Sequence, residues 1–201
     1  LPVLESCFES LLRRDHPDPK KRDGIMSLDS SRCEKGSEIT TYDSLDHSLC
    51  PSKGSTYIAM KSWASCLALE KIFRAAGKEN KSLEAFAQAR LIADTLVEAY
   101  STYGFVPAVL PEGDPGTDTG VKKVSVPRIA PLQSRIIPVI EGLIYPHFNG
   151  CDDVLDFNGP FGDLLRVLRA HTAQVLKPKV CLFPDGGWKL SSTSDNSWMS
   201  K

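Results

Sequence analysis

Two strongly periodic stretches joined by a short turn constrain the fold of this chain more than any other feature. Residues 57–76 and 82–100 carry apolar side chains at steps of three and four, which is the period of one face of an α-helix. Gly77 stands where a glycine commonly ends a helix, and Ser82 is the predicted N-cap of the second helix. Because the connection is so short, the two helices are predicted to pack as an antiparallel pair. The side chains predicted to be buried are Ile58, Met60, Trp63, Ala64, Leu67, Ile72 and Phe73 in the first helix and Leu83, Phe86, Ala87, Leu91, Thr95 and Leu96 in the second.

The rest of the chain alternates further helices with long polar connections. Helices are predicted over residues 1–14, 135–145 and 161–176, with an extended piece over 105–110. The connections 20–56 and 111–133 are much longer than ordinary turns, and loops of that length are usually functional or disordered. Helix pairs joined alternately by tight turns and long loops predict an all-α fold of the toroid type, because a plain bundle would need shorter connections. The loops 20–56 and 184–197 are predicted to lie at the same rim.

The composition excludes several classes of partner. The chain has 201 residues, 41% of them hydrophobic and 24% charged, as in an ordinary globular domain. Its formal net charge of −1 creates no long-range attraction for nucleic acid or an anionic membrane. No stretch approaches the roughly 18 apolar residues of a membrane span, and no signal peptide is visible, so a cytoplasmic location is expected. The chain does not begin with Met and stops as an apolar pattern starts, which indicates truncation at both ends.

The cysteines give no sign of a metal site. They occur at positions 7, 33, 50, 66, 151 and 181, with no CxxC spacing. A disulfide framework would suit a smaller secreted chain, so reduced thiols are expected, several of them facing the core. Cys33, His47 and Cys50 do not fit a common zinc-ligand spacing. No metal and no cofactor is therefore expected.

The segment 38–47 holds the densest set of reactive side chains, including Asp43 and Asp46 beside Tyr42. Cleavage of a glycosidic bond needs a carboxylic acid that protonates the departing oxygen. A loop carboxyl beside an aromatic ring can have its pKa raised enough for that role. Most loop aspartates only form turns or cap helices, so composition alone favours a structural role for both carboxylates.

A second segment, 183–198, combines flat aromatic groups with hydrogen-bonding groups. Trp188 and Trp198 flank a run of hydroxyl and amide side chains, and the glycines at 186–187 permit a sharp turn before it. A sugar site needs both kinds of group, since a ring face needs apolar contact and each hydroxyl needs a partner. The polar candidates are Lys189, Ser192, Asp195 and Asn196. The alternative is a surface loop in which each tryptophan merely anchors the core.

Other candidate residues carry less weight. Arg135 and Glu141 could be site residues or a pair on a helix surface, and the structural role is favoured. His16, His147 and His171 have no nucleophile motif nearby, so a Ser/His/Asp hydrolase is not supported. No GxSxG, P-loop or dinucleotide-binding motif occurs in the sequence.

At its two candidate segments the sequence resembles glycoside hydrolase family 52, the bacterial β-xylosidases. The matching stretches follow one another along nearly the whole chain and read KKRDGIMSLDSSRCEKGSEITTYDSLDHSL, KSWASCLALEKIF, SRIIPVIEGLIYPHF and CLFPDGGWKLSSTSDNSWMSK. Thr41-Tyr42-Asp43 also resembles the acid/base segment of the related family 116 β-glucosidases, which favours Asp43 over Asp46. Residues 50–56 and the connection 111–133 depart from the family's pattern.

The resemblance implies a fold and a mechanism. The family's catalytic domain is an (α/α)6 barrel behind a β-sandwich, so residues 1–201 are expected to form part of one such barrel domain, truncated at both ends. The family acts with retention through a Glu nucleophile, which should lie upstream of Leu1, and Asp43 would be the acid/base. The residues expected to bind the sugar are Tyr42, Asp46, Trp188, Lys189, Ser192, Asp195 and Asn196.

The expected activity is that of a retaining, exo-acting xylan 1,4-β-xylosidase that releases xylose from xylo-oligosaccharides. A β-glucosidase is the neighbouring alternative, because its substrate differs by one exocyclic CH₂OH group. A non-catalytic remnant with weak sugar binding is the alternative from a different class, and the 201-residue chain alone is expected to be inactive. The expected partner is a small sugar, and a homodimer of the parent enzyme is compatible with the sequence.

Overall fold

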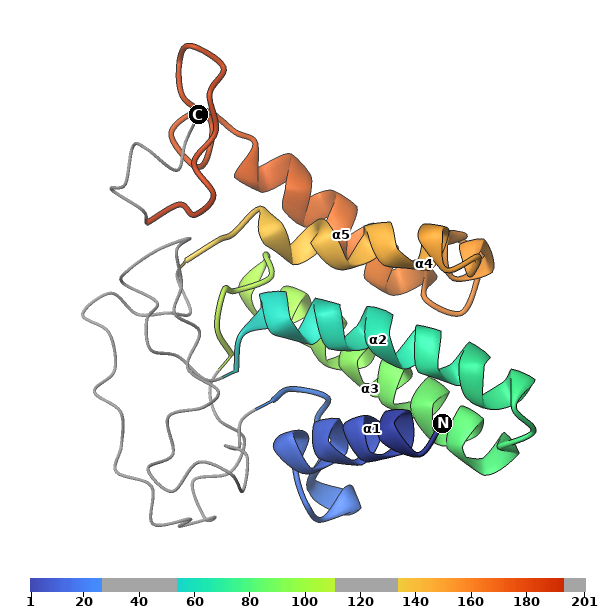
Figure 1. Ribbon diagram of the computed structural model, residues 1–201. Helices are drawn as coiled ribbons and strands as arrows, with labels where there is room; N and C mark the ends of the chain where they lie inside the picture. The colour runs from blue at the N-terminus through green and yellow to red at the C-terminus, as the bar shows by residue number, and fades with distance from the viewer. Residues whose placement is uncertain (27–53, 111–133, 194–201) are drawn as a thin grey trace.

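The computed structural model describes residues 1–26, 54–110 and 134–193, which Figure 1 shows as a stack of helices. The α-helices are α1 (Pro2–Asp15), α2 (Thr56–Ala75), α3 (Glu79–Tyr103), α4 (Ile144–Phe148) and α5 (Gly162–Val175), and the 3-10 helices are η1 (Pro19–Lys21), η4 (Pro138–Leu143) and η5 (Asp152–Leu155). Extended segments within these ranges form isolated bridges and no strand. No helix in the described ranges is long and apolar enough to cross a membrane. The predicted mainly helical fold is confirmed.

Helices α2 and α3 form the antiparallel pair that the sequence predicts (Figure 1). Gly77 has a φ of +68°, the left-handed conformation that favours glycine, and it turns the chain from one helix toward the other. α3 begins at Glu79, so the prediction that Ser82 is its N-cap is wrong. Ser82 lies buried inside the helix, where its Oγ donates to Oε1 of Glu70 in α2 (3.3 Å). Ser82 thus lies inside α3 and contacts α2 instead of capping the helix.

The core between these helices pairs large side chains of α2 with small ones of α3. Met60, Trp63, Leu67 and Phe73 of α2 are at most 2% exposed, as predicted. The buried residues of α3 are Ser82, Ala85, Gln88, Ala89, Ile92, Ala93, Leu96 and Ala99. Ile72 and Leu83 are 41% and 61% exposed, and Ala87 is exposed as well, so their predicted burial is wrong. A pattern defined by large residues missed the alanine face, which lets α3 pack closely on α2.

The segment 135–145 is only partly helical, in contrast to the prediction. Arg135 and Ile136 form antiparallel bridges with Pro107 and Ser191, and helical structure begins at Pro138 as η4 before continuing as α4. Proline disfavours helical backbone in the residue that precedes it, which explains why the helix cannot begin earlier. The predicted helices over 1–14 and 161–176 are present as α1 and α5.

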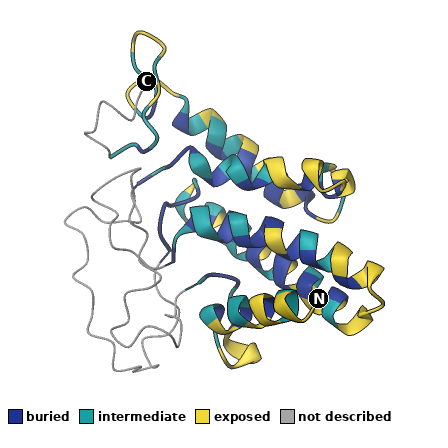
Figure 2. Cartoon of the chain, viewed as in Figure 1, coloured by how far each residue is buried: buried dark blue, intermediate teal, exposed yellow. Residues whose placement is uncertain are grey.

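One apolar core joins the helices. α2 contacts α3 on one side and η4 with α4 on the other, and α3 also contacts α5. Trp63 of α2 and Phe86 of α3 both pack edge-on against Phe161, with ring centroids 5.3 and 5.6 Å away. α1 joins this core because its Phe8 packs against Phe73 of α2, with ring centroids 5.8 Å apart. Figure 2 shows buried residues along the inner faces of the helices and exposed residues along the outer faces.

Gly142→Ala is expected to lower the free energy of unfolding by about 2 kcal/mol, because η4 approaches α2 too closely for a side chain. A Cβ at this position would lie 2.5 Å from the carbonyl oxygen of Met60 and 2.9 Å from its carbonyl carbon. Gly77→Ala is the matched control: its positive φ costs about 1 kcal/mol, but a Cβ there would meet no atom within 4 Å. Chemical denaturation measures both variants, and equal losses would contradict the close-contact explanation.

Candidate site at the rim of the helix pairs

The ends of the described ranges are hydrogen-bonded to one another at the N-terminal end of α2. The amide of Gly54 donates to the carbonyl of Met26 (3.2 Å), and the amide of Leu110 donates to the carbonyl of Gly54 (2.9 Å). The amide of Ala108 donates to the carbonyl of Ser134 (2.8 Å). The segments that meet here, which we call the rim, are residues 54–56, 105–110, 134–137 and 188–193. The long connections therefore leave and rejoin the described structure at one place.

The segment 188–193 is held at the rim by backbone pairing with the segment before η4. Ile136 and Ser191 form an antiparallel bridge, and the amide of Ile137 donates to the carbonyl of Leu190 (3.0 Å). The amide of Ser192 donates to the carbonyl of Arg135 (2.9 Å), and its Oγ accepts from the Arg135 amide (3.0 Å). The Ser192 hydroxyl is thereby fixed in position by the backbone of Arg135.

Three hydroxyl groups reinforce this pairing. Ser134 Oγ lies 2.9 Å from Ser191 Oγ and 2.8 Å from Thr193 Oγ1, and the last two are 3.1 Å apart. Ser134 and Ser191 are fully buried. A buried cluster of hydroxyls is a favourable arrangement only when each has a partner, so it fixes the two segments in a single register. In the sequence, Ser191 is recognisable only as part of a polar run, and nothing marks Ser134, which is 57 residues away.

Trp188 follows a tight turn that aims it away from the core. The amide of Phe183 donates to the carbonyl of Gly187 (2.8 Å), and Gly186 adopts a φ of +85°. Trp188 is 52% exposed, so the alternative in which it anchors the core is wrong. Lys189 directs its Nζ to the carbonyl of Ser192 (3.3 Å). The structure therefore brings Trp188, Lys189 and Ser192 together on one short loop.

His171 connects α5 to the rim through two hydrogen bonds, a role that was not predicted from the sequence. The amide of Val106 donates to its Nδ1 (3.1 Å), and its Nε2 lies 2.9 Å from the carbonyl oxygen of Ile136. Because Nδ1 must accept a proton, the ring is neutral and carries its hydrogen on Nε2. Burial, together with the positive charge of Arg135, lowers the pKa of His171. The partners lie 65 and 35 residues away, so no local pattern could reveal this contact.

Arg135 and Glu141 both have neighbours inside the fold. The Arg135 guanidinium lies 4.3 Å from the centre of the Phe105 ring. Glu141 forms an ion pair with Lys61 of α2 (3.1 Å) and accepts a hydrogen bond from the Tyr145 hydroxyl (2.9 Å). Burial pushes the pKa of Glu141 up, but hydrogen bonds led by that of Tyr145 outweigh it and lower the pKa. Both residues have partners within the fold, but Arg135 lies in the extended segment before η4, so its predicted place on a helix surface is wrong.

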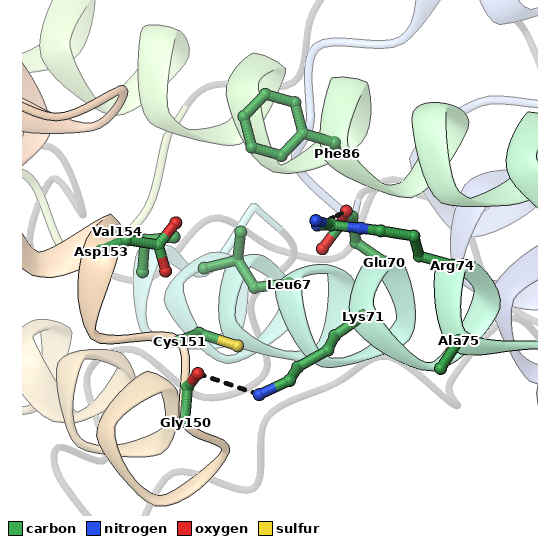
Figure 3. Close-up of a pocket in the computed structure, with 10 residues that line it drawn as sticks. All are labelled: Leu67, Glu70, Lys71, Arg74, Ala75, Phe86, Gly150, Cys151, Asp153 and Val154. Atoms are coloured by element: carbon green, nitrogen blue, oxygen red, sulfur yellow. Dashed lines mark hydrogen bonds and ion pairs between the residues drawn. The ribbon is translucent and has the colours of Figure 1, made fainter.

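A cavity of about 540 Å³ lies away from the rim, between the C-terminal half of α2 and the turn at 150–154 (Figure 3). Glu70 and Arg74 form an ion pair on its wall, and Lys71 donates to the carbonyls of Asn149 (2.8 Å) and Gly150 (2.9 Å). These three charged side chains already bind protein atoms. This cavity is a weaker candidate for sugar binding than the rim.

Several predicted site residues fall outside the described ranges. They are Tyr42, Asp43, Asp46, Asp195 and Asn196. Their proposed roles therefore stay predictions. The same holds for Trp198 and for the set Cys33, His47 and Cys50. The four cysteines that the structure describes, Cys7, Cys66, Cys151 and Cys181, are free thiols.

Comparison with known proteins identifies two relatives of this sequence. The chain is 48% identical to a β-xylosidase from Geobacillus stearothermophilus over all 201 of its residues, which span 26% of that protein. It is 38% identical to another β-xylosidase from Geobacillus stearothermophilus over 91 residues, which are 45% of this chain and 15% of that protein. No family model matches the chain. By sequence, the chain is therefore a relative of the β-xylosidases and spans about a quarter of the length of the first of these two enzymes.

Proposed function

We propose that this chain belongs to a retaining, exo-acting xylan 1,4-β-xylosidase of glycoside hydrolase family 52 and that Asp43 is its acid/base. The observation that carries the proposal is the 48% identity to a β-xylosidase over all 201 residues. The geometry supports it, because Met26 and Gly54, which flank the segment with Asp43, are hydrogen-bonded at the rim. The loop with Trp188 is anchored at the same rim.

The proposed reaction proceeds in two steps. Asp43 protonates the leaving oxygen while a Glu nucleophile attacks the anomeric carbon, which gives a covalent glycosyl-enzyme. Asp43 then removes a proton from the water that hydrolyses this intermediate, so the product keeps its β configuration. We place the nucleophile in the remainder of the enzyme, since the relative is much longer than the chain.

The loop 188–193 is proposed to bind the sugar. The exposed face of Trp188 offers apolar contact to the C–H groups of a pyranose, and the Ser192 hydroxyl and Lys189 offer hydrogen bonds to its oxygens. The remaining proposed sugar-binding residues are Tyr42, Asp46, Asp195 and Asn196.

The architecture that fits this function is an (α/α)6 barrel, of which residues 1–201 form one part. Two antiparallel pairs, α2 with α3 and η4/α4 with α5, pack side by side as successive pairs of such a barrel would (Figure 1). The long connections start and end at one rim, where the cleft of a barrel would lie. A homodimer of the whole enzyme is compatible with this arrangement.

The whole protein that carries this sequence is expected to hydrolyse p-nitrophenyl β-xyloside with a higher kcat/KM than p-nitrophenyl β-glucoside. The site would be shaped to a sugar without the exocyclic CH₂OH group, and a poor fit to that group lowers kcat/KM. The opposite preference would support the β-glucosidase alternative. Turnover of neither substrate would support a remnant that at most binds sugar.

Trp188→Ala is expected to weaken the binding of xylobiose about tenfold, which corresponds to about 1.4 kcal/mol of lost ring contact. Trp188→Phe keeps a flat apolar ring and should lose less. Phe148→Ala is the matched control, because Phe148 is 76% exposed on α4 and lies outside the rim. Isothermal titration calorimetry measures all three variants, and equal affinities in Trp188→Ala and Phe148→Ala would contradict the proposed sugar contact.

A further inference from the structure

We propose that His171 is a positioning residue for the rim, whose neutral ring holds two rim segments on α5 and whose protonation releases them. The consequence for a sugar ligand rests on the proposed function above. The effect on the rim itself rests on the described contacts alone.

The ring connects α5 to both of the segments that support the candidate loop. It accepts from the Val106 amide through Nδ1 and donates to the Ile136 carbonyl through Nε2, at 3.1 and 2.9 Å. Val106 is followed by Pro107, which pairs with Arg135, and Ile136 pairs directly with Ser191. A displacement of the ring is therefore transmitted to the loop 188–193 through backbone pairing.

Protonation would convert one of these two bonds into a repulsive contact. An imidazolium carries a hydrogen on both nitrogens, so Nδ1–H would face the Val106 N–H while Nε2 still donates to Ile136. His171 is 0% exposed, and water cannot reach the ring unless the contact opens. A buried donor that loses its acceptor is costly, so opening of the 105–110 segment becomes the favoured response.

The surroundings of the ring also oppose a positive charge. Arg135, on the segment before η4, is a like charge that acts on His171. Cys181, whose thiol contacts the Arg135 carbonyl, is neutral because burial raises its pKa to about 11. On α5 itself, the neutral amide of Gln174 donates to the Gly104 carbonyl (2.6 Å). No carboxylate within residues 1–26, 54–110 and 134–193 acts on the ring to stabilise an imidazolium.

The direction of the pH effect follows from this environment. Burial lowers the pKa of folded His171 below its usual value of 6.5, so the released state binds a proton more readily than the closed state. The contribution of His171 to rim stability is therefore present above about pH 6.5 and is lost as the pH falls below it. The helix pair α2–α3 makes no such contact and should not share this dependence.

Amide hydrogen exchange of the 201-residue chain, followed by NMR from pH 7.5 to 5.0, tests the proposal. After correction for intrinsic exchange, protection of the Val106 and Ser192 amides should fall by up to about tenfold per pH unit. Protection in the interior of α2 should stay constant. The ring nitrogen resonances should show the Nε2–H tautomer at pH 7.5, with protonation parallel to the loss of Val106 protection.

Two variants sharpen the test. His171→Asn places an amide oxygen where Nδ1 accepts and cannot titrate, so its rim protection should be independent of pH. His147→Asn is the control, because His147 is exposed and pairs with Asp152 outside the rim (2.7 Å), and it should keep the wild-type dependence.

Constant rim protection in the wild type, or the wild-type slope in His171→Asn, would overturn the proposal. If His171→Asn does not fold, the ring resonances of the wild type provide the test. An imidazolium at pH 7.5, or protonation that does not parallel the loss of Val106 protection, would also overturn the proposal.

A separate experiment adds xylobiose at pH 7.5. If xylobiose does not raise the hydrogen-exchange protection of the amides of residues 188–193, sugar binding by this loop is contradicted. The role of His171 at the rim is not affected by that result.

Discussion

Asp43→Ala will slow hydrolysis of a poor leaving group by about 10² to 10⁴ in a catalytically active protein that carries this sequence, because general acid catalysis contributes a factor of that size. Aryl xylosides with acidic phenols depart without being protonated, so they should lose much less in glycosylation. Steady-state kinetics over a series of leaving-group pKa values measures this difference. A loss that is equal for good and poor leaving groups would contradict the acid role of Asp43.

Azide provides the complementary test of the base role. The small anion can occupy the space of the missing carboxylate and attack the glycosyl-enzyme without needing a base, so Asp43→Ala with azide should form β-xylosyl azide. Asp46→Ala should show neither the leaving-group dependence nor the rescue. If the two variants exchange these properties, the acid/base role belongs to Asp46.

Asp15→Ala is expected to lower the free energy of unfolding by about 3 kcal/mol, because it leaves buried donors without an acceptor. The Asp15 carboxylate is 2% exposed and accepts from the Gly24 amide (2.8 Å), the Asp23 amide (3.1 Å) and the Gln88 side chain (2.7 Å). It thereby joins the end of α1 and the chain after it to α3. Urea denaturation with a two-state analysis measures the loss.

The control for this variant is Asp94→Ala. Asp94 is a residue of α3, but its side chain is 67% exposed. Its Oδ1 lies 3.9 Å from Nη2 of Arg90. An exposed pair of this kind contributes less than about 1 kcal/mol. Similar losses in Asp15→Ala and Asp94→Ala would show that the buried hydrogen bonds do not stabilise the fold as described.

Asp15 also gives a pH dependence of defined sign. Burial raises its pKa above the usual 3.8, and the hydrogen bonds from Gln88 and the backbone only partly offset this. The folded state therefore favours the protonated acid, and this contribution is full below about pH 3.8 and is lost as the pH rises through the folded pKa. Asp15→Asn cannot ionise, so the stability of the wild type relative to this variant should decrease as the pH rises through that range.

The sequence predicted those parts of the fold that depend on local periodicity. α2 and α5 each place large apolar residues on one face, and both were predicted within about two residues of their ends. The buried face of α3 was predicted correctly at Leu96 but not at Ala85, Ala89 and Ala93, which carry too little apolar surface to mark it. When the core face of a helix consists of small residues, the helix that packs on it, here α2, determines which face is buried. The sequence pattern of the helix itself does not show that packing.

The candidate site was predicted in its residue types and only partly in its geometry. Trp188, Lys189 and Ser192 could be chosen because aromatic and hydroxyl groups are adjacent in sequence. The contacts that hold them could not, since Ser134 meets Ser191 across 57 residues and His171 meets Val106 across 65. Such pairs arise from the packing of helix pairs, and no spacing rule connects their members.

We propose that the segment with Asp43 and the loop with Trp188 bind one and the same sugar. A crystal structure of an Asp43→Asn variant of the active protein with bound xylobiose tests it most directly. We expect the side chain at position 43 to lie within hydrogen-bond distance of the glycosidic oxygen and the Trp188 ring to contact the same disaccharide. Xylobiose bound away from the rim, or a position 43 that points away from the glycosidic oxygen while Trp188 holds the sugar, would contradict it.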